Sequence, residues 1–270
     1  MPPPKIHIEN IVHEYFNPNT WQRVRALDGL SLDVPQGEFV CLVGPSGCGK
    51  STLLYLVAGL TRPTGGRILL DGREVVGPGQ DRGMVFQEFA ILPWRTVAGN
   101  IGHGLEIART PRRIKDETIR RYVALMGLSG FEQKYPHELS GGMRQRVAVA
   151  RTLAADPEVV LMDEPFASLD AQTRNVMQEE LVRIALNERK TIVFVTHSVD
   201  EAIILGDRVV VLTRRPGRIK ASVVIEIPRE HRRWDVLGTE ERFGRYRQEI
   251  LKMIREEFDA QDRTAEAVQA

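Results

Sequence analysis

The sequence predicts an α/β fold built around a parallel sheet. Apolar, strand-like segments alternate with helical segments along most of the chain, which is the pattern of strands joined by helical crossovers. A glycine-rich turn, GPSGCGKST at Gly44–Thr52, lies between one such strand and one such helix. A mainly helical stretch from about residue 88 to residue 155 interrupts the alternation. These three observations indicate a core with an anion-binding turn and an inserted helical region.

The strands expected before the helical region are short and bounded by turns. Ile6, Ile8 and Val12 lie in a mixed apolar and polar segment that we expect to form an edge strand. Pro- and Gly-containing turns then separate the segments that follow. We expect strands at 30–34, 38–43, 67–71 and 83–86, and an apolar helix at 50–58 that stops at Gly59.

The second half of the chain returns to alternation after the helical region. An apolar helix is expected from Gly141 to Ala155, with Ser140 as its N-cap. Further strands are expected at 159–162, 191–196, 207–213 and 218–227, with a helix at 172–189 and an amphipathic helix at 241–258. The basic run REHRR at 229–233 is interpreted as a solvated face, and the alternative is contact with lipid headgroups or with a membrane protein.

The composition is that of an ordinary globular protein. The 270 residues carry a net charge of +1, which gives no indication of nucleic-acid binding. The two cysteines, Cys41 and Cys48, lack metal-site spacing and favour a reducing compartment. The start, MPPPKIHIEN, does not resemble a signal peptide. No apolar run approaches the roughly 18 residues of a membrane helix, so any membrane-spanning part must come from other chains.

The glycine-rich turn carries the clearest chemistry. It fits the pattern of a glycine, four free residues, then glycine, lysine and serine or threonine. Its glycines let the backbone bend around an anion, and the helix start adds N–H donors. Lys50 would bring a charge to the outer phosphates, and the Ser51 hydroxyl would ligate Mg²⁺. The alternative, a turn that binds nothing, does not account for the flanking strand and helix. The residues concerned are Gly44, Pro45, Ser46, Gly47, Cys48, Gly49, Lys50, Ser51 and Thr52.

Two carboxylates follow the strand expected at 159–162. Ligands of α/β sheets bind beyond the carboxyl ends of strands, so Asp163 and Glu164 are expected to meet the glycine-rich turn. Asp163 would hold Mg²⁺, which usually keeps part of its water shell. Glu164 would accept a proton from an attacking water. The alternative is a pair of solvated loop acids.

The segment Leu139–Met143, LSGGM, indicates a second anion site, because a serine and two glycines open a helix there. One chain rarely needs two such sites for one triphosphate, so the second is expected to serve a nucleotide held by another copy. The segment resembles the signature of the ATP-binding-cassette (ABC) ATPases. The usual fifth residue is glutamine, and here it is Met143. The groups expected to donate hydrogen bonds to phosphate are the Ser140 side chain and the N–H groups of Gly141 and Gly142. We therefore expect Met143 to leave phosphate binding intact.

The resemblance covers roughly residues 5 to 225. It implies a P-loop NTPase with a RecA-like core, an antiparallel β subdomain and an inserted helical subdomain. The ATPase domain would span residues 5–240 with the helical subdomain at about 88–155, and residues 241–270 would form a C-terminal amphipathic helix and tail.

The resemblance also assigns residues outside the motifs already described. Gln87 matches the glutamine that joins the core to the helical subdomain and senses Mg²⁺ and the attacking water. Asp170 closes the short loop from Ser168 that crosses the dimer interface in this family. His197 matches the histidine that contacts the γ-phosphate, and Tyr15 sits where an aromatic ring stacks on adenine. Taken without the family, Gln87 would close a strand and His197 would cap a strand end.

The resemblance further implies an ATPase subunit of a membrane transporter, with ATP and Mg²⁺ as cofactors. Its expected partners are a second ATPase subunit in a homodimer, integral membrane permease subunits and, indirectly, a periplasmic or lipid-anchored solute-binding protein. It would lie peripherally at the cytoplasmic face of the inner membrane. LPWRTV at 92–97 and RRPGRI at 214–219 resemble the nitrate, sulfonate and taurine branch of the importers.

Three other functions are left open by these residues. An exporter ATPase of the same family would respond to a hydrophobic compound. A soluble ABC ATPase of DNA repair or translation would usually carry tandem cassettes or long inserted arms. A small-molecule kinase would share the glycine-rich turn, but it would lack LSGG and would need an acceptor site.

Overall fold

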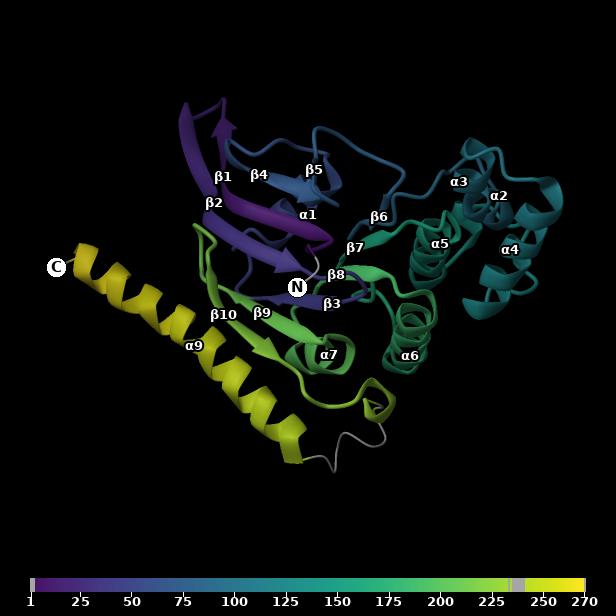
Figure 1. The fold of residues 1–270 in the computed structure, drawn as a ribbon. Helices are drawn as coiled ribbons and strands as arrows, with labels where there is room; N and C mark the ends of the chain where they lie inside the picture. The colour runs from purple at the N-terminus through teal and green to yellow at the C-terminus, as the bar shows by residue number, and fades with distance from the viewer. Residues whose placement is uncertain (1–2, 233, 235–240, 270) are drawn as a thin grey trace. The chain divides into compact units, whose positions relative to one another are not determined.

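The computed structural model describes residues 3–232, 234 and 241–269 (Figure 1). The chain divides into two compact units. The first unit comprises residues 1–79 and 191–270, and the second unit comprises residues 80–190. No helix among the described residues combines the length and the apolar character needed to cross a membrane.

The first unit contains most of the strands. Its strands are β1 (Ile6–Asn17), β2 (Gln22–Val34), β3 (Phe39–Val43), β4 (Gly65–Leu70), β5 (Arg73–Glu74), β8 (Thr191–Val195), β9 (Arg208–Leu212) and β10 (Ile219–Val224). Its helices are α1 (Lys50–Ala58), α7 (Val199–Leu205), the 3-10 helix η2 (Arg229–His231) and α9 (Glu241–Gln269). One sheet is antiparallel with the order β2-β1-β4-β5, and a second places β10, β9, β3 and β8 side by side in that order.

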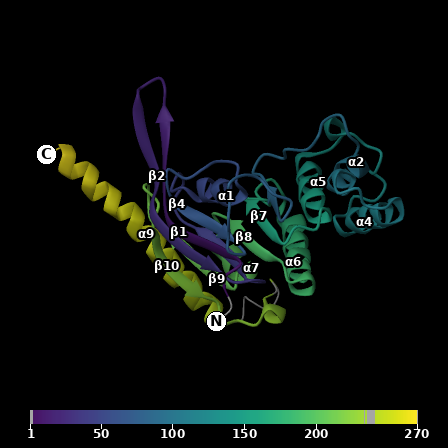
Figure 2. The same ribbon diagram turned by 45° about the horizontal axis from the view of Figure 1, so that its top comes forward.

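Strand β1 is an interior strand, so the expectation of an edge strand at 6–12 was wrong. It pairs with β2 on one side and with β4 on the other. Its polar positions reflect a sheet with one solvated face, because buried and less buried side chains alternate along it. The pairing with β4 ends at Val12 and Gly65, so the far end of the β1–β2 hairpin extends beyond β4 (Figure 2).

The predicted parallel sheet is confirmed around β3. Strand β3 pairs in parallel with β8 and with β9, and Leu42 lies opposite Val195 and Val210. All five residues of β3 and of β8 are buried. Such continuous apolar runs are typical of parallel strands that are covered on both faces. Both strands therefore end at one edge of the sheet, which is where the glycine-rich turn and His197 begin.

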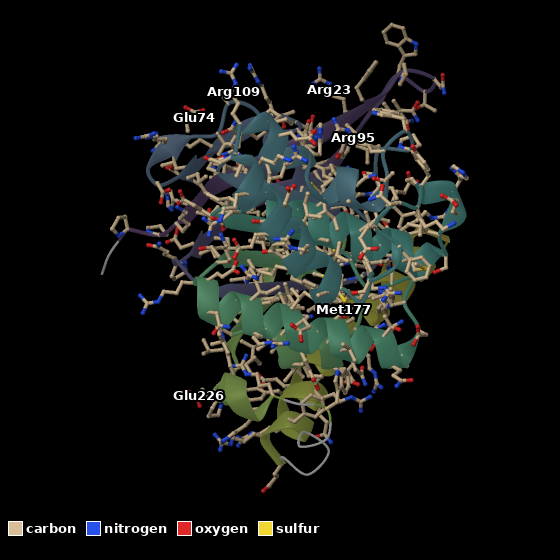
Figure 3. The ribbon with its side chains drawn as sticks, turned by 90° about the vertical axis from the view of Figure 1, so that its right-hand side faces the viewer. Arg23, Glu74, Arg95, Arg109, Met177 and Glu226 are labelled. Atoms are coloured by element: carbon tan, nitrogen blue, oxygen red, sulfur yellow. The ribbon has the colours of Figure 1, made fainter. Side chains whose placement is uncertain are left out.

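Helix α9 is longer than the expected helix at 241–258, since it runs for 29 residues to Gln269. It packs against α7 and β9 along one side of the first unit (Figure 1). Glu226, labelled in Figure 3, connects α9 to the strand region: its N–H donates to Tyr246 Oη at 3.2 Å, and its carbonyl accepts from Arg242 at 3.3 Å. Lys220 donates to the Met253 carbonyl at 2.8 Å. These contacts fix the helix on its own unit.

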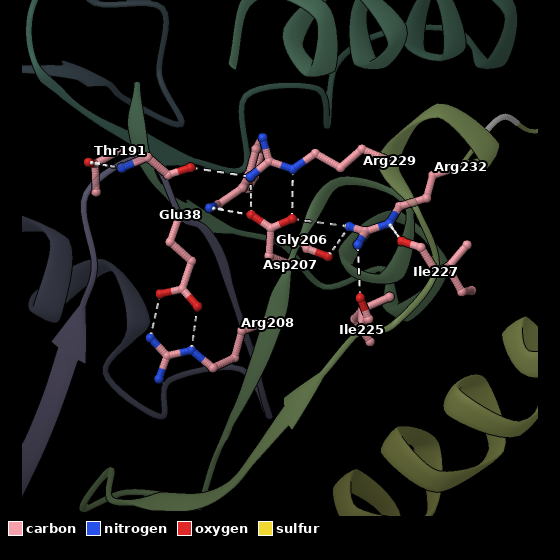
Figure 4. Close-up of polar contacts among 11 residues, drawn as sticks. Glu38, Thr191, Gly206, Asp207, Arg208, Ile225, Ile227, Arg229 and Arg232 are labelled. Carbon is pink, nitrogen blue, oxygen red and sulfur yellow. Dashed lines mark hydrogen bonds and ion pairs between the residues drawn. The ribbon is translucent and has the colours of Figure 1, made fainter. Parts of the chain in front are cut away.

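Polar contacts fasten the amino ends of the parallel strands (Figure 4). The Asp207 carboxylate, directly before β9, accepts from the N–H of Phe39 at 2.9 Å and from the Arg229 guanidinium. Arg208 forms a two-point ion pair with Glu38, with distances of 2.9 and 2.6 Å. Bidentate arginine–carboxylate pairs combine strength with a fixed geometry, so they set the register in which these strands start.

Arg232 contradicts the interpretation of REHRR as a solvated face. Its side chain is only 5% exposed. Its guanidinium donates to the carbonyls of Ile227 at 2.6 Å, Gly206 at 2.5 Å and Ile225 at 2.9 Å (Figure 4). Burial lowers the pKa of Arg232 and nearby Asp207 opposes that shift, yet an arginine stays charged in proteins. The basic run is therefore partly a structural clamp; Arg233 lies outside the described residues.

The second unit consists mainly of helices. Its elements are β6 (Arg82–Val85), α2 (Val97–Ile101), α3 (His103–Ile107), α4 (Arg112–Leu125), the 3-10 helix η1 (Pro136–Glu138), α5 (Gly141–Ala154), β7 (Val159–Asp163) and α6 (Ala171–Glu188). Strands β6 and β7 are parallel, with Val85 opposite Met162. Ser140 caps α5 by accepting from Met143 N at 3.2 Å, as the sequence predicted. The predicted helical stretch thus resolves into several short helices and the long α4 and α5.

We predict that Arg232→Ala lowers the free energy of unfolding by about 3 kcal/mol, because it leaves three buried carbonyls without their donor. Arg232→Lys should recover only part of this, since an ammonium cannot reproduce the guanidinium fork. Chemical denaturation measures both values. Arg255→Ala on the exposed face of α9 is the control and should change stability by less than about 0.5 kcal/mol. Equal losses in the two alanine variants would contradict the clamp.

Candidate nucleotide-binding site

The glycine-rich turn adopts a conformation that only glycines allow with ease. It leaves the carboxyl end of β3, and Gly44, Gly47 and Gly49 have φ angles of 152°, 73° and 101°. A Cβ on Gly44 would lie 2.8 Å from the Leu212 carbonyl oxygen, and one on Gly49 would lie 2.6 Å from a Leu27 methyl carbon. The turn is thus tightly bent, and neighbouring residues of the first unit lie close to its glycines at both ends. A tight bend is what an anion-binding turn requires.

Gly217 supports the turn from behind, and it was not identified from the sequence. Its N–H donates to Ala26 at 2.8 Å and its carbonyl accepts from Asp28 N at 3.1 Å. A Cβ at Gly217 would lie 2.0 Å from the Cys48 carbonyl oxygen. Only a glycine permits this approach of two backbones. The sequence shows it merely as a turn residue in RRPGRI.

Lys50 lies within the turn rather than on the surface. Its side chain is 8% exposed, and Nζ donates to the carbonyls of Gly44 at 2.8 Å and Pro45 at 3.0 Å. Cys48 Sγ is 3.7 Å from the same nitrogen. Burial raises the pKa of the Cys48 thiol, and the charge of Lys50 partly offsets this. The cysteine therefore stays a neutral packing residue beside the ammonium.

Helix α1 begins directly after the turn and presents its amino end there. Gly49 is its N-cap, and within the described residues no side chain caps this end. The first N–H groups and the positive end of the helix dipole suit a phosphate. The helix ends at Gly59 with φ 76°, as predicted.

Tyr15 is linked to the same helix. Its hydroxyl lies 3.1 Å from Thr52 Oγ1, and its ring meets the His13 ring edge-on, with centroids 4.7 Å apart. The ring remains 45% exposed. The structure therefore brings Tyr15 next to the predicted phosphate-binding residues and leaves it partly exposed.

His197 follows β8, the neighbour of β3. Because β3 and β8 are parallel, His197 and the glycine-rich turn leave the same edge of the sheet. The imidazole is exposed. Tyr15, the turn at 44–52 and His197 are thus all carried by the first unit.

The second unit carries the other predicted residues. Gln87 follows β6, and Asp163 ends β7, so both leave the carboxyl ends of two paired parallel strands. Asp163 is buried, at 1% exposure. Glu164 has a φ of 46°. Left-handed backbone at a residue other than glycine costs about 1–3 kcal/mol and is often found at functional sites.

The signature residues lie close to the loop that ends in Asp170. A Cβ on Gly142 would be 3.2 Å from the Leu169 side chain. Asp170 caps α6 by accepting from Thr173 N at 2.9 Å, and this hydrogen bond lowers the pKa of Asp170. The guanidinium of Arg144 lies 5.1 Å from the centre of the Phe89 ring. This last contact was not predicted, because residues 89 and 144 come together only through folding.

The residues present suit a nucleoside triphosphate with Mg²⁺. The glycine-rich turn and the start of α1 form a backbone cradle of the kind that holds phosphate. Mg²⁺ prefers oxygen ligands. The first unit offers the hydroxyl of Ser51, and the second unit separately offers the Gln87 amide and the Asp163 carboxylate. Among the described residues there is no group of three or more His, Cys, Asp or Glu side chains that could hold a metal ion by themselves.

Comparison with known proteins agrees with these features. The family described as ABC transporter matches residues 27–167. An uncharacterised ABC transporter ATP-binding protein of Methanocaldococcus jannaschii is 54% identical over 94% of this chain and 92% of its own length. The nitrate import ATP-binding protein NrtD of Synechocystis sp. is 45% identical over 86% and 89%, and the taurine import ATP-binding protein TauB of Roseobacter denitrificans is 43% identical over 92% and 93%.

A solved structure shows the same fold. The dimeric, post-hydrolysis state of the ATP-binding cassette MJ0796, bound to ADP and Pi, is similar with a TM-score of 0.73 and 28% sequence identity. The match covers 82% of this chain and 99% of that one.

We predict that Lys50→Ala strongly weakens binding of Mg-ATP, because it deletes a charge-assisted contact to phosphate. The loss should be at least about tenfold in the dissociation constant, measured by isothermal titration calorimetry. Lys252→Ala, at an exposed position of α9, is the matched control and should bind normally. An unchanged dissociation constant for Lys50→Ala would contradict the assignment of Lys50.

Proposed function

This chain belongs to the ABC transporter family of ATPases, and we propose that it powers an importer of nitrate, a sulfonate, taurine or a similar small solute. The observation that carries the solute class is the 43–45% identity, over most of the chain, to proteins named as nitrate and taurine import ATP-binding proteins. We also propose that residues 5–240 form the ATPase domain, with a helical subdomain at about 88–155.

The proposed reaction is hydrolysis of ATP. In phosphoryl transfer the protein contributes mainly by positioning the reacting groups and by stabilising their charge. The glycine-rich turn and Lys50 would hold the phosphates, and Tyr15 would stack on the base. Ser51, Gln87 and Asp163 would hold Mg²⁺, which neutralises phosphate charge when bound. Glu164 would take the proton of the attacking water, and His197 would contact the γ-phosphate.

The proposed working unit contains two ATPase chains. Ser140, Gly141 and Gly142 of one chain would bind the nucleotide held by the other chain, and Asp170 would lie near the boundary between them. The dimeric cassette MJ0796 supports this arrangement by analogy. Nucleotide that contacts both chains would shift the population towards the closed dimer, because its contacts differ between the two states.

The segment at 89–94 is proposed to contact a membrane permease. Asn100 is fully buried, and its amide group donates to the carbonyls of Leu92 at 3.1 Å and Arg95 at 3.0 Å while accepting from Leu92 N at 2.8 Å. Arg95 forms a 2.6 Å ion pair with Glu106. These bonds hold the segment in shape while Trp94 stays 71% exposed. A rigid segment that displays a large aromatic ring suits an interface.

We predict that Glu164→Gln keeps ATP binding but lowers kcat by about 10²–10⁴, the usual contribution of a general base. The variant should also accumulate as an ATP-bound dimer, visible by size-exclusion chromatography with light scattering. Glu158→Gln, which alters an exposed acid before β7, is the control and should turn over normally. Near-normal ATPase activity of Glu164→Gln would disprove the assignment.

We predict that Trp94→Glu abolishes solute uptake but leaves the ATPase activity of the isolated subunit within about twofold of the original, because it changes only an exposed side chain. Uptake of nitrate and of taurine is measured in vesicles that contain the complete transporter. Ile107→Glu, at another exposed apolar position of the second unit, serves as the control. Full uptake by Trp94→Glu would rule out this docking surface.

The same vesicles separate the proposed importer from the other family functions. An importer needs a permease and a solute-binding protein outside the membrane, whereas an exporter ATPase would be stimulated by a hydrophobic compound. A soluble ABC ATPase would not purify together with a polytopic membrane protein. Absence of any membrane partner after mild detergent extraction would therefore count against the transporter.

A further inference from the structure

The turn that carries His197 is held by an unusual hydrogen-bonded ring. Thr196, directly before the histidine, is 1% exposed. Its N–H donates to the Leu42 carbonyl at 3.3 Å, and its hydroxyl accepts from Ser198 N at 3.0 Å. The same hydroxyl donates to the Glu201 carboxylate. The residues on both sides of His197 are therefore tied to each other.

Glu201 departs from the usual way in which a helix start is capped. It is the third residue of α7, and its N–H donates to the N-cap Ser198 Oγ at 3.3 Å. In a standard capping box the carboxylate at this position would accept directly from the N-cap N–H. Here the Thr196 hydroxyl lies between them: it takes the Ser198 N–H and gives its own proton to Glu201.

Burying the Glu201 carboxylate costs free energy, and helix capping alone does not require that burial. Glu201 is 7% exposed, and a buried carboxylate is unfavourable unless hydrogen bonds compensate it. A hydrogen bond to a charged acceptor is stronger than one between neutral groups. The ring therefore fixes the backbone on either side of His197 more firmly than a solvent-exposed capping box would.

We propose that Thr196 and Glu201 are positioning residues for His197. The ring holds the backbone on both sides of the histidine, which is exposed and follows β8 at the carboxyl edge of the sheet, where the glycine-rich turn also begins. This inference rests on the proposed role of His197 at the γ-phosphate. On this proposal the restrained backbone limits the positions open to the imidazole before nucleotide is bound, and such positioning is worth large factors in rate.

The test measures steady-state ATPase kinetics of the full chain. Thr196→Val removes the hydroxyl at nearly constant shape, and we expect kcat to fall about tenfold while the KM for ATP stays within about twofold. Thr196→Ser keeps a hydroxyl and should restore most of kcat. The decisive comparison is a double-mutant cycle with His197→Ala. In the His197→Ala background, Thr196→Val should cause no further loss, because there is no imidazole left to position.

A second variant covers the case in which Thr196→Val does not fold. Glu201→Gln keeps the volume and an acceptor oxygen but removes the charge, so we expect a smaller fall in kcat that likewise disappears in the His197→Ala background. Asp200→Asn is the matched control. Asp200 lies in the same helical turn, but its carboxylate binds Arg247 of α9 at 2.6 Å, outside the ring, so kcat should be unchanged.

The outcomes separate this inference from the proposed function. If His197→Ala loses activity but the ring variants retain full kcat, or lose activity equally in both backgrounds, the positioning role is overturned and the ATPase assignment stands. If His197→Ala itself keeps full activity, the proposed role of the histidine and the positioning role both fail.

Discussion

The backbone of the glycine-rich turn is the constraint on which the first unit depends. N–H groups converge on an anion only if the chain bends back on itself, and the three positive φ angles at Gly44, Gly47 and Gly49 accomplish this. The neighbours then have little freedom. Leu27 and Leu212 press on the turn, and Gly217 meets the Cys48 carbonyl from behind. Strands β2 and β9 therefore leave no room for a side chain at Gly49 and Gly44 of the turn that follows β3.

Local features of this arrangement could be predicted from the sequence. The motif fixes the strand–turn–helix order, Gly59 marks the end of α1, and Ser140 marks the start of α5. The continuous apolar run of β3 indicates a strand buried on both faces. Each of these signals depends on neighbours in the sequence or on side-chain periodicity. The residues of the glycine-rich turn, which are proposed to bind nucleotide, could be identified from the sequence for the same reason.

Features that depend on distant residues could not be predicted. The polar positions of β1 resemble those of an edge strand, and only its pairing with β2 and β4 shows otherwise. REHRR reads as a solvated basic run because the carbonyls that bind Arg232 belong to three separate positions, at residues 206, 225 and 227. Ser198 and Glu201 have the spacing of a capping box, but nothing in that spacing reveals the intervening Thr196 hydroxyl.

The parallel strands of the first unit carry different kinds of residues at their two ends. At the amino ends, Asp207 accepts from Phe39 N, and Arg208 pairs with Glu38. At the carboxyl ends stand the glycine-rich turn and His197. The ion pairs at the start of the strands are thus separated, by the length of a strand, from the groups proposed to bind phosphate. This separation matters because a fixed carboxylate beside a phosphate would repel it, whereas the same carboxylate at the opposite end strengthens the fold. Within the first unit, the Thr196–Glu201 ring is an exception: its carboxylate is buried next to the histidine in sequence and accepts a hydrogen bond from a hydroxyl.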